Sequence, residues 1–280
     1  MIILGTGAAG RGHPAPVRGH TPWTRLVLLP VVDLDPELAA LRPLGGFFVL
    51  RTEGAAAPVS ASLATLAESY ATPLPDGPRD ALAVRVDLVA ERLRAPESRV
   101  AASIAQQGLA ARLWSAALGC AVLYGRLPDL APRLLRWDPL AGAPDDLWLT
   151  EVRLLPGEPD LAARVLQGHL VPLGETLTAR YGVASGLLWG NAGSALAGAA
   201  RELDRWARTH GRTDLAGRAR ALTDGLFAHP LLRTTGTRTG TAFRRRSCCL
   251  YYRVPGGGLC GDCCFTRPPR SSPGAASGRP

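Results

Sequence analysis

The residues from Arg244 to Phe265 read RRRSCCLYYRVPGGGLCGDCCF and hold five of the six cysteines of the 280-residue chain. Four of them form the pattern C-C-x10-C-x2-C: Cys248, Cys249, Cys260 and Cys263. Soft thiolates gathered on a short segment select zinc or an iron–sulfur cluster, whereas calcium and magnesium prefer oxygen ligands. The stretch therefore predicts a metal centre.

The residues between the two cysteine pairs predict that the chain folds back on itself. Residues 251–254 have the composition of a short strand, and Pro255 to Gly258 have that of a tight turn. Adjacent cysteines point in opposite directions on a regular strand, and a zinc ribbon uses two C-x2-C pairs instead. The spacing therefore favours a dinuclear cluster, whose two irons accept ligands from different directions.

A disulfide framework is another interpretation of a cysteine group. It is disfavoured because adjacent Cys248 and Cys249 cannot easily bridge to each other. The chain also has 46% hydrophobic residues and is long enough to fold around an apolar core without covalent links.

The positive charge of the chain is concentrated around these cysteines. The formal net charge is +9, and from residue 231 to the end nine arginines stand against one acidic residue, Asp262. The rest of the chain is nearly neutral. A nucleic-acid partner is therefore not expected, because it would need a basic surface on the body of the protein.

Apolar residues recur at helical spacing through most of the chain. We expect a mainly α fold with a minor β component (α+β), in which a helical body over 25–240 ends in a small cysteine knuckle over 241–265. Helices are expected at 63–70, 82–93, 98–125, 159–170, 173–181, 187–210 and 213–227. Weaker patterns predict strands at 25–32, 44–51 and 147–155, a linker at 128–144 and a disordered tail over 266–280. Ser98 is expected to cap the third helix.

The first residues match a dinucleotide-binding motif only in part. Gly5 to Gly10 fit G-x-G-x-x-G, but residues 11–16 contain two prolines where the motif requires a helix. We therefore expect a flexible leader over 1–24, with a start codon placed too early as one explanation. No signal peptide and no run of about 18 apolar residues is evident, which favours a cytoplasmic protein without an integral membrane span.

Two further observations complete the pattern near the C-terminus: an arginine run precedes the cysteines, and a Tyr-Tyr pair lies between them. The whole pattern resembles the FhuF-like ferric iron (ferric siderophore) reductase family. The helical region 98–125 and the segment LLWGNAGSAL at 187–196 are also similar to the family, so the likeness covers about 61–265.

The resemblance implies a [2Fe–2S] cluster on Cys248, Cys249, Cys260 and Cys263. An additional cysteine, Cys264, follows directly, and we favour Cys263 as the ligand because it keeps the C-x2-C spacing. Cys120 lies within a predicted helix and is expected to pack as a small apolar residue. His169 and His229 lack ligand spacing and are expected to be structural or surface residues.

The activity that the resemblance implies is delivery of one electron to Fe(III) held in a siderophore, supplied by a ferredoxin-like or flavin reductase donor. Hydroxamate and catecholate oxygens hold Fe(III) tightly, and reduction to the softer Fe(II) labilises it. Arginines near the cluster are expected to tune its potential or to dock an acidic donor, unless they form an exposed, solvated run. These arginines are Arg244, Arg245, Arg246 and Arg253. The candidate siderophore contacts are Trp148, Trp189 and Asn191, although tryptophans more often belong to a core.

Two alternatives remain open from the sequence. One is a zinc knuckle that binds nucleic-acid phosphates through its arginines. The other is a siderophore-binding or siderophore-biosynthesis scaffold whose metal site is only structural. Neither alternative requires the cysteines to carry an electron.

Overall fold

The computed structural model describes residues 38–53, 62–71 and 80–269. Within these ranges helices dominate and strands are short, which confirms the mainly α fold with a minor β component. The helical elements are η1 (Ala39–Leu44), α1 (Leu66–Tyr70), α2 (Ala81–Leu93), α3 (Ser98–Leu123), η3 (Pro132–Leu134), η4 (Ala162–Leu170), α4 (Val171–Tyr181), α5 (Ser185–Thr209), α6 (Thr213–Ala228) and η5 (Tyr251–Arg253). The strands are β1 (Arg51–Thr52), β2 (Leu135–Trp137), β3 (Leu147–Leu149), β4 (Gly236–Thr239) and β5 (Ala242–Arg245).

Helix α3 forms the centre of the core. It is apolar on nearly all sides, and α2, α4, α5 and α6 pack against it, so that its residues are buried almost continuously from Val100 to Leu123. Cys120 is completely buried within it, as the sequence predicts. The prediction that Ser98 caps this helix is wrong, because Glu97 is the N-cap and makes no side-chain capping bond.

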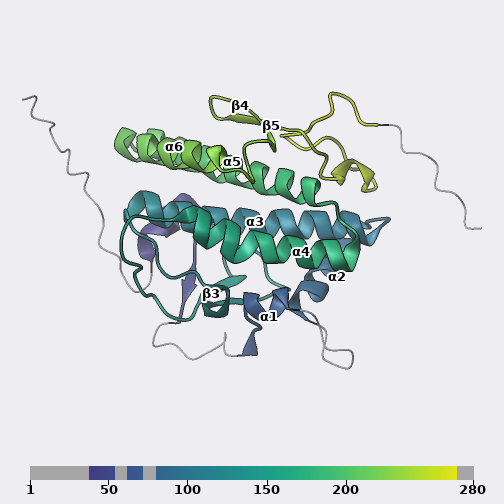
Figure 1. Cartoon of the computed structure of the whole chain (residues 1–280), viewed down its shortest axis with the longest axis horizontal. Helices are drawn as coiled ribbons and strands as arrows, with labels where there is room; N and C mark the ends of the chain where they lie inside the picture. Colours follow the sequence, from purple (N-terminus) through teal and green to yellow (C-terminus); the bar gives the residue numbers. More distant parts are fainter. Residues whose placement is uncertain (1–37, 54–61, 72–79, 270–280) are drawn as a thin grey trace, which may run out of the picture. The chain divides into compact units, whose positions relative to one another are not determined.

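Helices α5 and α6 lie on one side of α3, and the hairpin formed by β4 and β5 packs against α5 (Figure 1). Strand β3 and helix α1 are drawn on the other side of α3. No helix in the described ranges is both long enough and apolar enough to cross a membrane.

The two helices expected around Pro172 form one continuous helical run. Its first part, η4, is π-helical, and α4 follows with Pro172 in its first turn. His169 on η4 is completely buried, where its Nδ1 lies 2.9 Å from the hydroxyl oxygen of Tyr70 and its Nε2 lies 2.6 Å from the carbonyl oxygen of Leu130. Because a carbonyl oxygen only accepts, Nε2 donates and Nδ1 accepts. His169 is thus a structural residue.

The small sheet has the order β1-β3-β2, with β1 parallel and β2 antiparallel to β3. A buried ion pair between Arg112 Nε and Asp146 Oδ1, 2.8 Å apart, ties it to α3. The same guanidinium donates to the carbonyl oxygens of Gly46 and Val49, at 3.2 and 2.8 Å. Residues 45–49 are therefore held against α3.

Several strand predictions are wrong or only partly right. Of the strand expected at 44–51 only Arg51 belongs to a strand, because η1 ends at Leu44 and Gly45 adopts a φ of 104° that favours glycine. The linker expected at 128–144 contains η3 and β2, whose apolar side chains alternate toward the core. The strand expected at 147–155 ends at Leu149. The leader, the strand expected at 25–32 and the residues of the tail from 270 onward lie outside the described residues.

Candidate metal centre

The cysteine segment is held against α5 by glycines that permit close approach. A Cβ atom at Gly190 would lie 2.0 Å from the hydroxyl oxygen of Ser247, and one at Gly193 would lie 2.5 Å from that of Thr235. These glycines belong to the segment LLWGNAGSAL at 187–196, and the structure shows what approaches them. Thr235 precedes the hairpin and Ser247 follows it, so the segment that leads into the first cysteine pair packs directly on α5.

The expected fold-back of the cysteine segment is confirmed. The Sγ atoms of Cys249 and Cys260 lie 3.6 Å apart, one from each cysteine pair. The turn begins at Pro255, but residues 251–253 form the 3₁₀ helix η5 and not the expected strand. The preceding residue, Leu250, has a φ of 68°, which ends extended backbone before η5.

The thiols are arranged as neighbours along this loop. Cys248 is hydrogen-bonded to Cys249, and Cys264 interacts with both Cys248 and Cys263. Cys249 is 3% exposed, whereas the other four are only partly buried. The five cysteines therefore form a cluster in which Cys249 faces the protein interior and the others lie nearer the surface.

The environment separates the acidities of these thiols. The hydrogen bond from Cys248, together with the positive charge of Arg245, lowers the pKa of Cys249 to about 5 despite its burial. Burial raises the pKa of Cys260 to about 12, although Arg245 opposes this shift. Arg245 is thus the arginine whose charge reaches the thiols of both cysteine pairs.

Arg245 is itself buried, with 3% exposure, on the inner face of β5. Its guanidinium donates to Asn191 Oδ1 and, at 2.9 Å, to Ser194 Oγ. Asn191 Nδ2 donates at 3.0 Å to Ser103 Oγ, and that hydroxyl donates at 2.8 Å to the carbonyl oxygen of Cys249. A buried polar network therefore connects α3, α5 and β5 to the backbone of the first cysteine pair.

The same network also includes Asp262, which lies between the cysteines of the second pair. The backbone N–H of Arg245 donates to the carbonyl oxygen of Asp262 at 3.0 Å. The Asp262 carboxylate accepts from Ser194 Oγ and lies 3.3 Å from Arg201 NH1. Helix α5 therefore fixes the residue that lies between Cys260 and Cys263.

The other three arginines of the predicted set have different surroundings. Arg244 points outward and donates to the carbonyl oxygen of Cys264 at 3.1 Å, and the side chain of Arg246 is exposed. Arg253 pairs with Glu97 at the start of α3. The structure thus brings Arg245 alone of the four into the buried network behind the thiols.

The three candidate siderophore contacts are not brought together. Asn191 is completely buried in the network, and its position is that of a support for the cysteine loop. Trp189, the second residue before it on α5, is partly buried and lines a cavity of about 510 Å³. Trp148 lies on β3, where its indole N–H donates to the carbonyl oxygen of Asp145 at 3.0 Å.

The surroundings of the thiols suit a sulfur-bound cluster. Backbone N–H groups of Leu250 and Phe265 donate to the Sγ atoms of Cys248 and Cys263, at 3.3 and 3.4 Å. Buried Arg245 Nε has no acceptor among the described residues. Donors of this kind around the sulfurs are one means by which proteins tune iron–sulfur centres.

No group of three or more His, Cys, Asp or Glu side chains within the described ranges is arranged to hold one metal ion. The Sγ atoms of Cys249 and Cys260, 3.6 Å apart, come from the two cysteine pairs, and a cluster of two irons can accept ligands from both pairs.

Family models match two adjoining parts of the chain. Residues 107–242 match the ferric iron reductase FhuF-like transporter family, and residues 245–265 match the FhuF 2Fe-2S C-terminal domain. The chain belongs to the FhuF-like family. Its cofactor is a [2Fe–2S] cluster, and the family supports a redox role in ferric iron reduction. No curated protein sequence matches the chain.

The second matched region, 245–265, contains Arg245, Asp262 and all five clustered cysteines. The assignment of Cys248, Cys249, Cys260 and Cys263 as ligands stays a prediction. Sequence reasoning missed Ser103, Ser194, Arg201 and Asp262 as supports of this loop. The available signal was the asparagine and serine embedded among glycines and alanines at 187–196, since a polar residue in such a segment usually has a buried partner.

Proposed function

We propose that this FhuF-like protein is a ferric siderophore reductase of the cytoplasm. The observation that carries the proposal is the two-sided environment of the thiols. Cys249 and Arg245 lie inside the protein, whereas Cys248, Cys260, Cys263 and Cys264 are partly exposed. An electron can therefore leave toward a substrate that docks outside, without that substrate entering the core.

A [2Fe–2S] cluster held by Cys248, Cys249, Cys260 and Cys263 would supply the one electron that reduces siderophore-bound Fe(III) to Fe(II). The residues of the chain hold the cluster and set its charge environment. Arg245 is a positioning residue that places a buried positive charge next to both cysteine pairs, and such a charge favours the reduced, more negative state. A ferredoxin-like or flavin reductase donor would supply the next electron to the protein.

We place the siderophore contact at a cavity of about 430 Å³ between residues 44–48, α3 and α5. Asp262 forms part of its lining, so that a molecule bound there lies beside the cysteine loop. Phe47 lines the same cavity and is 50% exposed. It offers an apolar surface that the Arg112 bonds to neighbouring carbonyls hold in place.

The cavity that Trp189 lines is the second candidate for this contact. Its walls are formed mainly by α4 and α5, and its lining does not include a residue of the cysteine loop. Phe47→Ala should raise the KM for ferric siderophore with little change in kcat, whereas Trp189→Ala should leave both unchanged. The reverse result would move the contact to the second cavity.

The central experiment is anaerobic purification with metal analysis, followed by an electron paramagnetic resonance spectrum of the reduced protein. We expect two irons for each chain, a reduced [2Fe–2S] signal and stoichiometric loss of that signal on addition of ferric siderophore. Cys260→Ser should abolish cluster assembly while helical circular dichroism is retained. A colourless zinc protein would support the zinc-knuckle alternative, and a reduced cluster that ferric siderophores cannot reoxidise would support the scaffold.

A further inference from the structure

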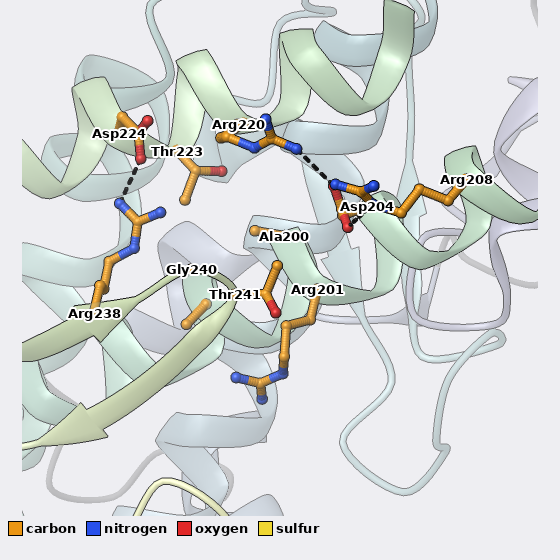
Figure 2. A pocket seen from close by; sticks show the side chains of 11 residues that line it. Ala200, Arg201, Asp204, Arg208, Arg220, Thr223, Asp224, Arg238, Gly240 and Thr241 are labelled. Carbon is orange, nitrogen blue, oxygen red and sulfur yellow. Dashed lines mark hydrogen bonds and ion pairs between the residues drawn. The ribbon is translucent and has the colours of Figure 1, made fainter. Parts of the chain in front are cut away.

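A cavity of about 620 Å³ lies between α5, α6 and the β4–β5 hairpin. Its volume is in the range that small-molecule sites occupy. Figure 2 shows that arginines from all three elements border it. Arg201 and Arg208 come from α5, Arg220 comes from α6 and Arg238 comes from β4.

The lining of this cavity carries more positive than negative charge. Four arginines face two carboxylates, those of Asp204 and Asp224. Asp204 is shared, since Arg208 Nε lies 2.6 Å from one of its oxygens and Arg220 NH2 lies 3.4 Å from the other. One carboxylate thus serves two guanidiniums, which leaves a local excess of one positive charge.

The guanidiniums of Arg208 and Arg220 also keep unused donors. Each makes one bond to Asp204, and their remaining N–H groups have no acceptor among the described residues. Arg238 differs, because it pairs with Asp224 at 2.7 Å and stacks over the ring of Phe227. The free donors therefore concentrate at the end of the cavity near Asp204. A guanidinium matches two oxygens of one carboxylate or phosphate group.

We propose that this cavity binds a small oxyanion, a molecule that carries carboxylate or phosphate groups, on the free guanidinium donors of Arg208 and Arg220. The hairpin closes the cavity through its turn, where Gly240 and Thr241 form part of the wall. The site is separate from the thiols and requires no electron transfer, so that it stands independently of the proposed reduction.

Arg201 links this site to the metal centre. Its side chain lines the cavity, and its NH1 lies 3.3 Å from Asp262 Oδ1, in the loop between Cys260 and Cys263. An anion bound nearby competes with Asp262 for the Arg201 guanidinium. The Asp262 charge would then be less well compensated beside the cluster, and reduction of the cluster would become less favourable. The anion should therefore bind the oxidised protein more tightly than the reduced protein.

The binding test uses isothermal titration calorimetry of the cluster-containing protein with citrate and, separately, with inorganic phosphate. Sodium chloride at matched ionic strength is the reference, because general screening acts on every exposed charge. Saturable binding of either probe supports the site. Preference for citrate identifies a carboxylate ligand, and preference for phosphate identifies a phosphate ligand.

Arg220→Gln is the test variant because it removes one of the two guanidiniums that keep free donors, and Arg220 does not contact the cysteine loop. We expect it to weaken binding by about tenfold or more, the usual effect of one hydrogen bond to a charged group. Arg205→Gln is the control, since Arg205 is an exposed arginine of α5, the other helix that borders the cavity, but it pairs with Glu202 and does not line the cavity. Circular dichroism confirms that both variants fold.

The link to the cluster is tested by measuring its reduction potential with and without the anion. A lower potential at saturation is expected, and Arg201→Gln should remove that dependence. If the anion binds the oxidised protein ten times more tightly than the reduced protein, thermodynamic linkage requires saturation with the anion to lower the reduction potential by about 59 mV, because reduction transfers one electron. Absence of saturable binding, or equal loss of affinity in Arg220→Gln and Arg205→Gln, would overturn the site. A potential that responds to ionic strength alone would overturn the link.

Discussion

Replacement of Arg245 by glutamine should lower the reduction potential of the cluster. The side chain is 3% exposed, and its charge acts on the thiols of Cys249 and Cys260. Reduction adds one negative charge to the cluster, and a buried positive charge stabilises that state because little water screens it. Its removal therefore penalises the reduced form more than the oxidised form.

The magnitude follows from the effect of one opposite charge on an ionisable group. Such a charge within about 4–6 Å shifts a pKa by about 1–3 units, and one unit equals about 1.4 kcal/mol. For a one-electron couple each factor of ten corresponds to about 59 mV. The added electron resides on iron, behind the sulfurs, so we take the lower end and expect a fall of about 60 mV.

Two further variants separate charge from architecture. Arg246→Gln removes the charge of the next residue, whose side chain is exposed, and should shift the potential by less than a third as much. Arg245→Lys keeps the charge but cannot reproduce both side-chain bonds to Asn191 and Ser194, so it should retain most of the potential while lowering thermal stability.

The measurement is a redox titration followed by visible absorption and electron paramagnetic resonance, on protein with verified iron content. An unchanged potential in Arg245→Gln with an intact cluster would refute the reasoning. Equal shifts in Arg245→Gln and Arg246→Gln would refute it as well, because they would indicate an effect of net charge and not of the buried guanidinium.

Three other perturbations test the fold and the ligand set. Gly193→Ala should weaken the packing of the hairpin on α5 and lower iron content, because its Cβ would lie 2.5 Å from the buried Thr235 hydroxyl and 3.2 Å from the Phe243 ring, whereas Gly186→Ala, with no atom within 4 Å, should be neutral in iron analysis. Burial lowers the pKa of His169 from 6.5 to about 4, so the unfolded chain binds the extra proton and stability should fall, by up to about 1.4 kcal/mol per pH unit, as pH drops from about 6.5 to 4. His169→Gln should flatten that profile in denaturant titrations. Cys263→Ser should lose the reduced-cluster spectrum and Cys264→Ser should keep it, and the opposite pattern would exchange the two ligand assignments.

Helical periodicity predicted the body of the fold because long amphipathic segments carry their own signal. The expected helix at 82–93 corresponds to α2, and those expected at 187–210 and 213–227 correspond to α5 and α6. The hairpin was missed because residues 236–245 contain one large apolar side chain, Phe243, and their burial depends on glycines in a distant helix. Tertiary contacts of this kind cannot be obtained from local propensity.

The role of Arg245 could have been predicted if the hairpin had been. Alternation on a strand places Phe243 and Arg245 on one face and Arg244 on the other. When residues 242–245 are not recognised as a strand, the sequence does not indicate which of the three arginines at 244–246 points into the protein. Asn191 illustrates the same difficulty on a helix. Whether its side chain is buried depends on whether α3 or solvent lies beside that face of α5, and the sequence of α5 alone does not show this.

Helix α5 supports the cysteine motif through its contacts with Arg245 and Asp262. Asn191 and Ser194 hold Arg245 behind the thiols, and Ser194 and Arg201 hold Asp262 between the second pair. Arg201 also lines both the cavity beside residues 44–48 and the cavity beside the hairpin. A ligand in either cavity that draws on this guanidinium weakens the same contact to Asp262. Because one side chain serves both cavities and the loop, substrate docking, anion binding and cluster potential should be thermodynamically coupled, and Arg201→Gln should uncouple them.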